Sequence, residues 1–456
     1  MTNIKSVNPY SGKTLKEFSP LTEEELNQKI RLSSDTFKTW KTQSFAERAR
    51  LMSNAAQELK DNREKYATII SQEMGKVLKE SLSEIDKCAW VCEYYAENAA
   101  RFLEAEPVSL SDGKKAKIIH QPLGTVLAVM PWNFPFWQVF RFAAPTLMAG
   151  NVAVLKHASN VPQCSLAIEE VFLKSGFPEG TFQSLLIDSE TTTKLIEREE
   201  IKAVTLTGSE KAGASVAAMA GKHIKKSLLE LGGSDPFIVL KDADLTEAAK
   251  TAVKARMVNF GQSCIAAKRF IVEEAVYDEF VKLFTEEVKK LQQGDPFDEN
   301  SDYACMARPD LAADLYLQVE KSILAGAKLL LGGEKPQADS AIFHPAILVD
   351  VPKEAPAYYE ELFGPVASIY KVANEVEAIE LANATEFGLG ASLWSQDSEK
   401  AAVLAAEIES GAVFVNAMVA SHPSLPFGGI KKSGYGRELS RYGILEFVNS
   451  KTVYLG

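Results

Sequence analysis

The sequence predicts an α/β protein with two doubly wound parallel-sheet domains, each covered by helices on both faces, and a small additional β element. Short β-prone runs alternate with helical stretches between about residues 118 and 221 and again between 236 and 416. Strands and helices that alternate along a chain need crossover connections, which produce parallel sheets. The 456 residues are enough for about three domain-sized units.

The first hundred residues have a helical pattern, because apolar residues recur at three- and four-residue spacing among many charges. The expected helices are 27–40, 45–59, 63–74 and 79–103.

The first alternating region predicts a sheet that binds a nucleotide at the carboxyl ends of its strands. The expected strands are 125–130, 152–155, 184–187 and 203–207, and the expected helices are 163–174, 192–198 and 211–221.

The second alternating region predicts the other domain. Its expected strands are 236–240, 269–272, 328–331, 366–370 and 412–416, and its expected helices are 245–257, 275–291, 313–325, 375–384 and 399–408. The tail 451–455 is β-prone, and a terminal strand of this kind often pairs with another subunit. We therefore expect a homodimer or a homotetramer.

Charge and composition argue against several classes of protein. Lys and Arg total 50 and Asp and Glu total 61, so the formal net charge is −11. Nucleic-acid binding draws on clustered cations, so no nucleic-acid partner is expected. Residues 1–15 lack an apolar stretch, and the apolar segment 124–150 is interrupted by prolines, so we expect neither a signal peptide nor a membrane span. Five cysteines in so long a chain do not form a disulfide framework, which favours the cytoplasm.

Cys88 and Cys92 lie one helical turn apart, which is the spacing of half a metal site. No second pair of Cys or His with ligand spacing accompanies them. Free cysteine is among the most buried residue types, so core packing is favoured for both, as it is for Cys164, and no metal is expected.

The most informative motif is Asn-Phe-Gly-Gln-Ser-Cys at 259–264. A loop of small residues after a long helix can hold the Cys264 thiol close to a ligand, and a polar, partly exposed setting favours the reactive thiolate. Taken alone, a cysteine is more often structural than catalytic.

Two further motifs supply polar groups. In Leu-Glu-Leu-Gly-Gly at 229–233, Glu230 stands beside two glycines and can take a proton from water if burial raises its pKa; an ordinary solvated carboxylate is the alternative. In Pro-Trp-Asn-Phe-Pro at 131–135, the Asn133 amide can donate to a developing oxyanion; an amide that caps its own turn is the alternative.

A fourth motif, Val-Thr-Leu-Thr-Gly-Ser at 204–209, leads into a helix start with Gly213. A strand followed by Gly-Ser and a helix places backbone N–H groups beside a phosphate. The spacing differs from the usual dinucleotide fingerprint, so this signal is weak by itself.

Together and in this order, these motifs resemble those of the aldehyde dehydrogenase superfamily. The resemblance covers essentially the whole chain. It runs from Asn-Pro-Tyr-Ser-Gly at 8–12 through Phe-Pro-Glu-Gly at 177–180 and Glu-Leu-Phe-Gly-Pro at 361–365 to Pro-Phe-Gly-Gly at 426–429 and Ser-Gly-Tyr-Gly-Arg-Glu at 433–438. It implies a dinucleotide-binding domain of residues 1–106 and 124–232, a catalytic domain of 233–439, and an oligomerisation element of 107–123 and 440–456.

The resemblance implies that Cys264 is the nucleophile, Glu230 the general base, and Asn133 the oxyanion donor together with the backbone N–H of Cys264. The implied reaction has two stages. The thiolate adds to an aldehyde, and hydride transfer to a nicotinamide leaves a thioester. Water activated by Glu230 then releases a carboxylic acid.

The resemblance also implies an NAD(P) site. Trp132, Gly208 and Ser209 would surround adenosine and pyrophosphate, Lys156 would reach the adenosine ribose, and Glu361 would bind the nicotinamide ribose beside Phe363. The full expected set is Trp132, Lys156, Ser159, Gly208, Ser209, Gly213, Leu231, Glu361 and Phe363.

One departure predicts the preferred cofactor. Relatives that use only NAD carry a Glu three residues after the lysine, where it repels a 2′-phosphate. Ser159 stands there in this chain, and Lys156 can pair with a phosphate. We therefore expect NADP to be preferred and NAD to be accepted.

The residue at 141 predicts the substrate. Relatives that oxidise succinate semialdehyde carry an Arg at this position, and Arg141 can hold a distal carboxylate by charge-assisted hydrogen bonds. Stretches 156–164 and 261–270 also resemble the shorter bacterial succinate-semialdehyde dehydrogenases. The alternative is that Arg141 forms a structural ion pair. The expected pocket contains Arg141, Trp137, Phe427 and Ser421, with Phe136 and Phe260 as further apolar candidates.

Other activities remain as alternatives. Within the family these are a broad-specificity enzyme, one acting on another semialdehyde such as glutarate semialdehyde, and a CoA-acylating enzyme, which would lack the base at Glu230. A cysteine hydrolase would need a histidine partner, and none has a signature near Cys264. Ala266 stands where some relatives have a second cysteine, so no local disulfide is expected; Cys305 replaces a frequent proline without a functional explanation from sequence.

Overall fold

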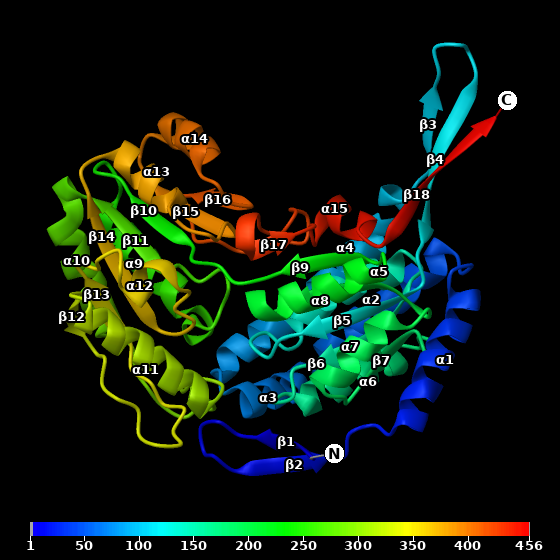
Figure 1. Ribbon diagram of the computed structural model, residues 1–456, viewed down its shortest axis with the longest axis horizontal. Coiled ribbons are helices and arrows are strands. Elements are labelled where there is room, and N and C mark those ends of the chain that lie inside the picture. Colours follow the sequence, from blue (N-terminus) through cyan, green and yellow to red (C-terminus); the bar gives the residue numbers. More distant parts are fainter. Residues whose placement is uncertain (1–2, 456) are drawn as a thin grey trace.

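The computed structural model describes residues 3–455 and contains two large α/β units, a projecting three-stranded sheet and a short N-terminal hairpin (Figure 1). Each large unit is a mostly parallel sheet with helices on its faces, which confirms the predicted fold class.

The first sheet has six strands in the order β17-β9-β8-β5-β6-β7. All neighbours are parallel except β17, which runs antiparallel to β9. Its strands are β5 (Thr125–Met130), β6 (Val152–His157), β7 (Phe182–Ser184), β8 (Ile201–Thr207), β9 (Lys226–Glu230) and β17 (Gly434–Tyr435). The connecting helices are α5 (Trp137–Met148), α6 (Pro162–Lys174), α7 (Ser189–Glu197) and α8 (Glu210–Lys222).

The direction in which strands are added reverses between β5 and β8, which are neighbours. Such a reversal opens a crevice at the carboxyl ends of the strands, where open α/β sheets bind ligands.

Four N-terminal helices belong to the same unit: α1 (Glu23–Trp40), α2 (Phe45–Asp61), α3 (Arg63–Met74) and α4 (Leu78–Phe102). α1 packs on the strands β5, β6 and β7, whereas the other three pack on one another and on α5 and α6. All four were predicted to within a few residues; α1 begins earlier than expected, because Thr22 and Glu25 form a reciprocal cap. The hairpin of β1 (Ile4–Val7) and β2 (Thr14–Phe18) was not predicted. Its second strand is almost wholly exposed, so it carries no alternating apolar pattern.

The second sheet has seven strands in the order β12-β13-β14-β11-β10-β15-β16, with only β12 antiparallel. The strands are β10 (Pro236–Val239), β11 (Arg269–Glu273), β12 (Lys328–Leu331), β13 (Ala346–Val349), β14 (Val366–Val372), β15 (Gly390–Trp394) and β16 (Ala412–Val415). The helices are α9 (Leu245–Met257), α10 (Glu274–Val288), α11 (Pro309–Leu324), α12 (Pro356–Tyr359), α13 (Glu375–Asn383) and α14 (Ser398–Glu407). The predictions missed β13 and β15, which are short and buried throughout.

The chain ends in a three-stranded antiparallel sheet that projects from the molecule (Figure 1). It contains β3 (Glu106–Ser109), β4 (Lys115–Pro122) and β18 (Val448–Leu455), and α15 (Ser440–Leu445) leads into it. The predicted tail strand is confirmed. It pairs with β4 along its whole length and forms one edge of the sheet.

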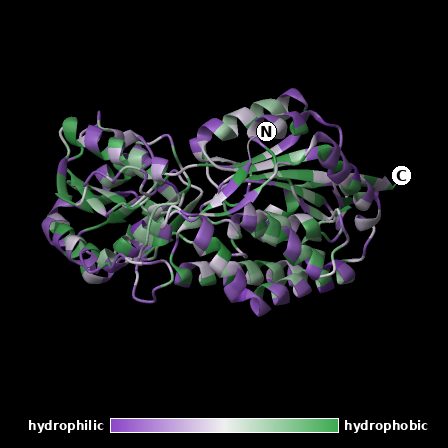
Figure 2. Ribbon diagram, turned by 90° about the horizontal axis from the view of Figure 1, so that it is seen from below, coloured by the Kyte–Doolittle hydropathy of each residue, from purple (hydrophilic) through white to green (hydrophobic). Residues whose placement is uncertain are grey.

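The strands of both large sheets are the most hydrophobic part of the chain, and outer helices alternate between hydrophobic and hydrophilic residues (Figure 2). Cys88, Cys92 and Cys164 are fully buried in the apolar cluster around the first sheet, which confirms core packing. No helix among residues 3–455 is long and apolar enough to span a membrane.

Cys305 has a packing role that the sequence did not reveal. Gly75 ends α3 with a left-handed φ of 80°. A Cβ there would lie 2.6 Å from Cys305 Sγ and 2.8 Å from Pro9 Cγ. The cysteine thus fills the space that the missing side chain leaves.

A Gly75→Ala substitution should lower the free energy of unfolding more than Gly12→Ala does. Gly12 has a similar φ of 70° but no atom within 4 Å of an added Cβ. In both variants the left-handed backbone lowers the free energy of unfolding by about 1 kcal/mol. In Gly75→Ala, overpacking lowers it by about 1–3 kcal/mol more. Urea denaturation measures both. Equal losses, or no partial recovery on adding Cys305→Ala, would contradict this packing role.

Candidate active site

The predicted site residues of the first sheet gather at one edge. Trp132 and Asn133 follow β5, Lys156 lies at the end of β6, Gly208 and Ser209 follow β8, and Glu230 ends β9. Because the carboxyl ends of parallel strands share one edge, the fold brings together residues about a hundred positions apart.

The start of α8 lies at the carboxyl edge of the first sheet, next to the end of β9. Ser209 caps the helix by accepting from the N–H of Ala212 at 3.4 Å, and Gly208 N–H donates to the Glu230 carbonyl at 3.0 Å. A Cβ at Gly213 would lie 2.6 Å from the side chain of Leu231. Glycine therefore lets α8 pack against the residue that follows β9. The free N–H groups of the first helical turn suit a phosphate.

Lys156 is half-buried and Ser159 is exposed in the turn after β6. Burial lowers the pKa of Lys156, and the Asp188 carboxylate opposes this shift. The two side chains thus present a cation and a hydroxyl near the same strand end.

His157, which the sequence analysis did not single out, supports the loop that carries Asn133. Its Nε2 lies 2.8 Å from the Pro135 carbonyl, and its Nδ1 accepts from Ala158 N–H at 2.9 Å. Burial lowers the pKa of His157 to about 4. The ring is therefore neutral, with its proton on Nε2.

Glu361 and Phe363 lie in the loop before β14 of the second sheet. Glu361 accepts from Gly233 N–H at 3.0 Å and pairs with Lys268 Nζ at 3.2 Å. The ring of Phe363 meets that of Trp132 edge-on, with centroids 5.8 Å apart. The contact between Trp132 and Phe363 joins the second unit to the carboxyl edge of the first.

The loop that carries Cys264 is strained. After α9, a 3-10 turn spans Val258–Gly261, and Asn259, Phe260 and Gly261 have φ values of 51°, 52° and 74°. Left-handed backbone is costly for residues with a Cβ and is concentrated at functional sites. A Cβ at Gly261 would collide with the Gly364 carbonyl.

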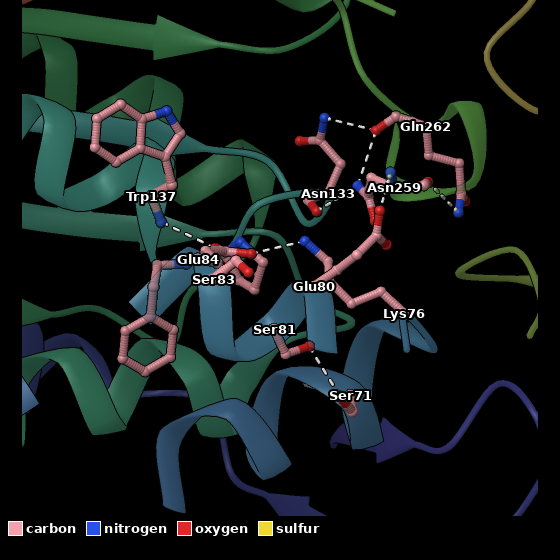
Figure 3. Close-up of polar contacts among 12 residues, drawn as sticks. Ser71, Lys76, Glu80, Ser81, Ser83, Glu84, Asn133, Trp137, Asn259 and Gln262 are labelled. Carbon is pink, nitrogen blue, oxygen red and sulfur yellow. Dashed lines mark hydrogen bonds and ion pairs between the residues drawn. The ribbon is translucent and has the colours of Figure 1, made fainter. Parts of the chain in front are cut away.

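Polar contacts hold this strained loop in place. Lys268 Nζ donates to the carbonyls of Ser263 and Cys264 at 2.8 and 2.7 Å. Asn259 N–H donates to the Glu80 carboxylate of α4 at 2.9 Å (Figure 3).

Asn133 is directed at the loop that carries Cys264. Its Nδ2 donates to the Gln262 carbonyl at 3.0 Å, and the amide of Asn259 donates to the carbonyls of both Asn133 and Gln262 at 2.7 and 3.1 Å (Figure 3). The second hydrogen of the Asn133 amide remains available to another acceptor.

Cys264 is partly exposed, whereas Glu230 is only 2% exposed. Burial raises the pKa of the Cys264 thiol to about 12, against the charges of Arg141 and Lys268. Burial, followed by the negative charge of Glu438, raises the pKa of Glu230 well above its ordinary value. Neither Glu230 carboxyl oxygen has a hydrogen-bond partner within residues 3–455. Its surroundings therefore disfavour the charged form of the Glu230 carboxyl.

A cavity of about 280 Å³ opens onto Cys264. All four predicted substrate residues line it, namely Arg141, Trp137, Ser421 and Phe427. The further candidates Phe136 and Phe260 do not line it, so that part of the prediction was wrong. Phe136 is packed in the core against Tyr66, and Phe260 stacks on Tyr303 with centroids 4.4 Å apart.

Both interpretations of Arg141 find support in its surroundings. The guanidinium forms an ion pair with Glu438, and both side chains are almost fully buried. It also lies 4.5 Å from the centroid of the Phe427 ring and contributes to the cavity wall beside Cys264.

One face of α4 forms a wall of the cavity that the sequence analysis missed. Glu80, Glu84 and Lys87 succeed one another at helical spacing, and all three line the cavity. Glu84 accepts from the N–H groups of Phe136 and Trp137 at 2.8 and 3.0 Å, so it caps α5, which has no cap of its own (Figure 3). The spacing was visible in the sequence, but no motif linked α4 to Cys264.

Comparison with known proteins agrees with this architecture. Residues 1–453 match the model of the aldehyde dehydrogenase family. A probable succinate-semialdehyde dehydrogenase [NADP(+)] of Synechocystis sp. is 52% identical over 452 residues, 99% of each chain. A succinate-semialdehyde dehydrogenase [NADP(+)] of Mycobacterium avium is 48% identical over 99% of this chain and 97% of its own.

A solved structure shares the fold of this chain. The succinic semialdehyde dehydrogenase of Streptococcus pyogenes, in complex with NADP+ as the cofactor, has a TM-score of 0.97 and 40% identity, with 99% of each chain covered. The family model matches nearly every residue, the relatives share about half of their residues with this chain, and the fold is the same. This chain therefore belongs to the aldehyde dehydrogenase family.

Proposed function

We propose that this aldehyde dehydrogenase oxidises succinate semialdehyde to succinate, with NADP preferred over NAD and through a thioester on Cys264. The observation that carries the proposal is one cavity that holds both the Cys264 thiol and the Arg141 guanidinium. A thiol and a cation in the wall of one cavity suit a short molecule with an aldehyde and a carboxylate. The names and the bound NADP+ of the relatives described above support the same substrate and cofactor.

The residues at the strand ends fit NADP. The free N–H groups at the start of α8 and the Trp132–Phe363 pair suit a dinucleotide. Gly208, Ser209, Gly213 and Leu231 would hold the phosphates, and Lys156 and Ser159 the 2′-phosphate. Glu361 and Phe363 would hold the nicotinamide end. When bound, NADP supplies the hydride acceptor.

The chain's own groups supply the rest of the mechanism. The Cys264 thiol gives its proton to solvent, a loss that the nearby charges of Arg141 and Lys268 favour, and the thiolate sulfur attacks the aldehyde carbon. Asn133 and the backbone N–H of Cys264 stabilise the oxyanion. After oxidation, Glu230 takes a proton from water, which attacks the thioester and releases succinate with the Cys264 sulfur as leaving group.

We propose in addition that the enzyme works in the cytoplasm as a homodimer or homotetramer. All five cysteines are free thiols, which suits a reducing compartment. The outer edge of β18 suits pairing with a second subunit, as edge strands do.

Replacing the nucleophile tests the reaction. Cys264→Ser should lower NADPH formation by about a thousandfold or more, because a hydroxyl is a far poorer nucleophile than a thiolate. Absorbance of NADPH measures the rate. Cys88→Ala, in the buried core, is the matched control and should retain activity per folded molecule. Undiminished turnover by Cys264→Ser would contradict the proposal.

The residue at position 159 tests the cofactor preference. Ser159→Glu should lower the ratio of kcat/KM for NADP to that for NAD by about 10- to 100-fold, because the carboxylate repels the 2′-phosphate. Ser159→Gln introduces a side chain of the same size as glutamate but without its charge, and should change the ratio much less. Steady-state kinetics with both cofactors decides, and an unaltered ratio in Ser159→Glu would rule out this explanation.

Replacing Arg141 tests the substrate preference. Arg141→Gln should lower kcat/KM for succinate semialdehyde about 10- to 100-fold more than kcat/KM for butanal, which has no carboxylate. Loss of the partner of Glu438 affects both substrates, so the ratio isolates the contact with substrate. Arg141→Lys, which keeps a cation, should retain part of the preference. Equal losses for both aldehydes would leave Arg141 as an ion-pair partner only.

A further inference from the structure

We propose that Lys87 is a second cation of the substrate site and determines the preference for aldehydes that carry a carboxylate at their far end. This inference rests on the proposed function, since it assigns a further residue to the same cavity.

Lys87 lies where three parts of the cavity wall meet. It belongs to the face of α4 that also carries Glu80 and Glu84. Its Nζ donates to the Ser421 hydroxyl oxygen at 2.7 Å and lies 4.4 Å from the centroid of the Trp137 ring. Ser421 and Trp137 are themselves predicted substrate residues, and the ammonium contacts both of them.

The charge of Lys87 has no carboxylate partner. No ion pair of Lys87 occurs within residues 3–455. Glu84, one turn earlier on α4, is engaged by Lys76 at 2.7 Å and by the two N–H groups at the start of α5. Arg141, by contrast, is balanced by Glu438. A half-buried cation without a counter-ion is incompletely solvated, and an anion that enters the cavity can compensate its charge.

The contact with Ser421 leaves donors for a substrate. An ammonium has three hydrogens, of which Ser421 accepts one. Because the Ser421 oxygen accepts from Lys87, its own hydrogen is free to donate. A carboxylate beside this pair receives hydrogen bonds from both groups, one of them charge-assisted. Arg141, on the same cavity wall, adds a second positive charge.

The surroundings of Lys87 make this contact sensitive to pH. Burial lowers the pKa of Lys87 to about 8, the charge of Arg141 acts in the same direction, and Cys88 and Glu84 act against it. The ammonium is therefore charged below this pH and increasingly neutral above it. The carboxylate of the substrate is ionised throughout, so the attraction weakens as pH rises through about 8.

The test compares kcat/KM for succinate semialdehyde with kcat/KM for butanal, which has the same number of carbons, in the full-length enzyme. In the wild type this ratio should be high at about pH 6.5 and fall towards about pH 9.5. Lys87→Met should lower the ratio about 10- to 100-fold at the lower pH, mainly through KM, and make it independent of pH. Titration of Cys264 or Glu230 affects both aldehydes and cancels in the ratio.

Two matched variants separate charge from packing. Lys87→Arg should keep the preference and extend it to higher pH, because guanidinium stays charged. Ser421→Ala keeps the cation and should retain the pH dependence. If Lys87→Met does not fold, the dependence of the kcat/KM ratio on pH in the wild type and in Lys87→Arg tests the role of Lys87 instead.

The outcomes distinguish the two proposals. A wild type that does not prefer succinate semialdehyde over butanal would refute the proposed function. A wild type with that preference, combined with a Lys87→Met variant that retains it or a wild-type ratio that is constant with pH, would overturn the role of Lys87 alone.

Discussion

The hydrogen bond from the Asn133 amide to the Gln262 carbonyl joins the two α/β units at the point where the thiol lies. Asn133 follows a strand of the first sheet, whereas Gln262 precedes a strand of the second. The edge-on contact of Trp132 with Phe363 crosses the same junction. The carboxyl edge of one sheet thus faces the loops that enter the other. Neither unit alone contains a complete set of reacting groups, so the chemistry depends on how firmly these contacts hold the units together.

Burial governs the electrostatics of the cavity. Cys264 and Glu230 both have raised pKa values, chiefly because their charged forms are poorly solvated. The same burial lowers the pKa of Lys87. Burial thus disfavours the charged forms of Cys264, Glu230 and Lys87 alike, whereas the Arg141 guanidinium has a counter-ion in Glu438. Charge complementarity and catalysis therefore draw on the same exclusion of water.

Much of this architecture could be predicted from the sequence, because helical periodicity and the alternation of strands and helices are local signals. Residues such as Cys264, Glu230 and Asn133 stood in motifs whose order pointed to one family. The wall formed by α4 could not be predicted, because Glu84 and Lys87 act through residues 50 to more than 300 positions away. Phe136 illustrates the opposite error: it follows the Asn133 motif directly, yet the start of α5 turns its ring into the core. β2 was missed because an exposed strand carries no apolar alternation.

The close approach at Gly261 matters for anyone who wishes to redesign this enzyme. Its missing side chain leaves room for the Gly364 carbonyl, with Pro365 N only 2.8 Å from where a Cβ would stand. Mutagenesis of either loop by itself would thus break the fit of both, and libraries should keep these glycines fixed. Lys87 on α4 is a better target, since it lines the cavity from a regular helix. Unlike Glu80, it makes no hydrogen bond to the strained turn, so substitutions there can reshape substrate choice while the turn stays intact.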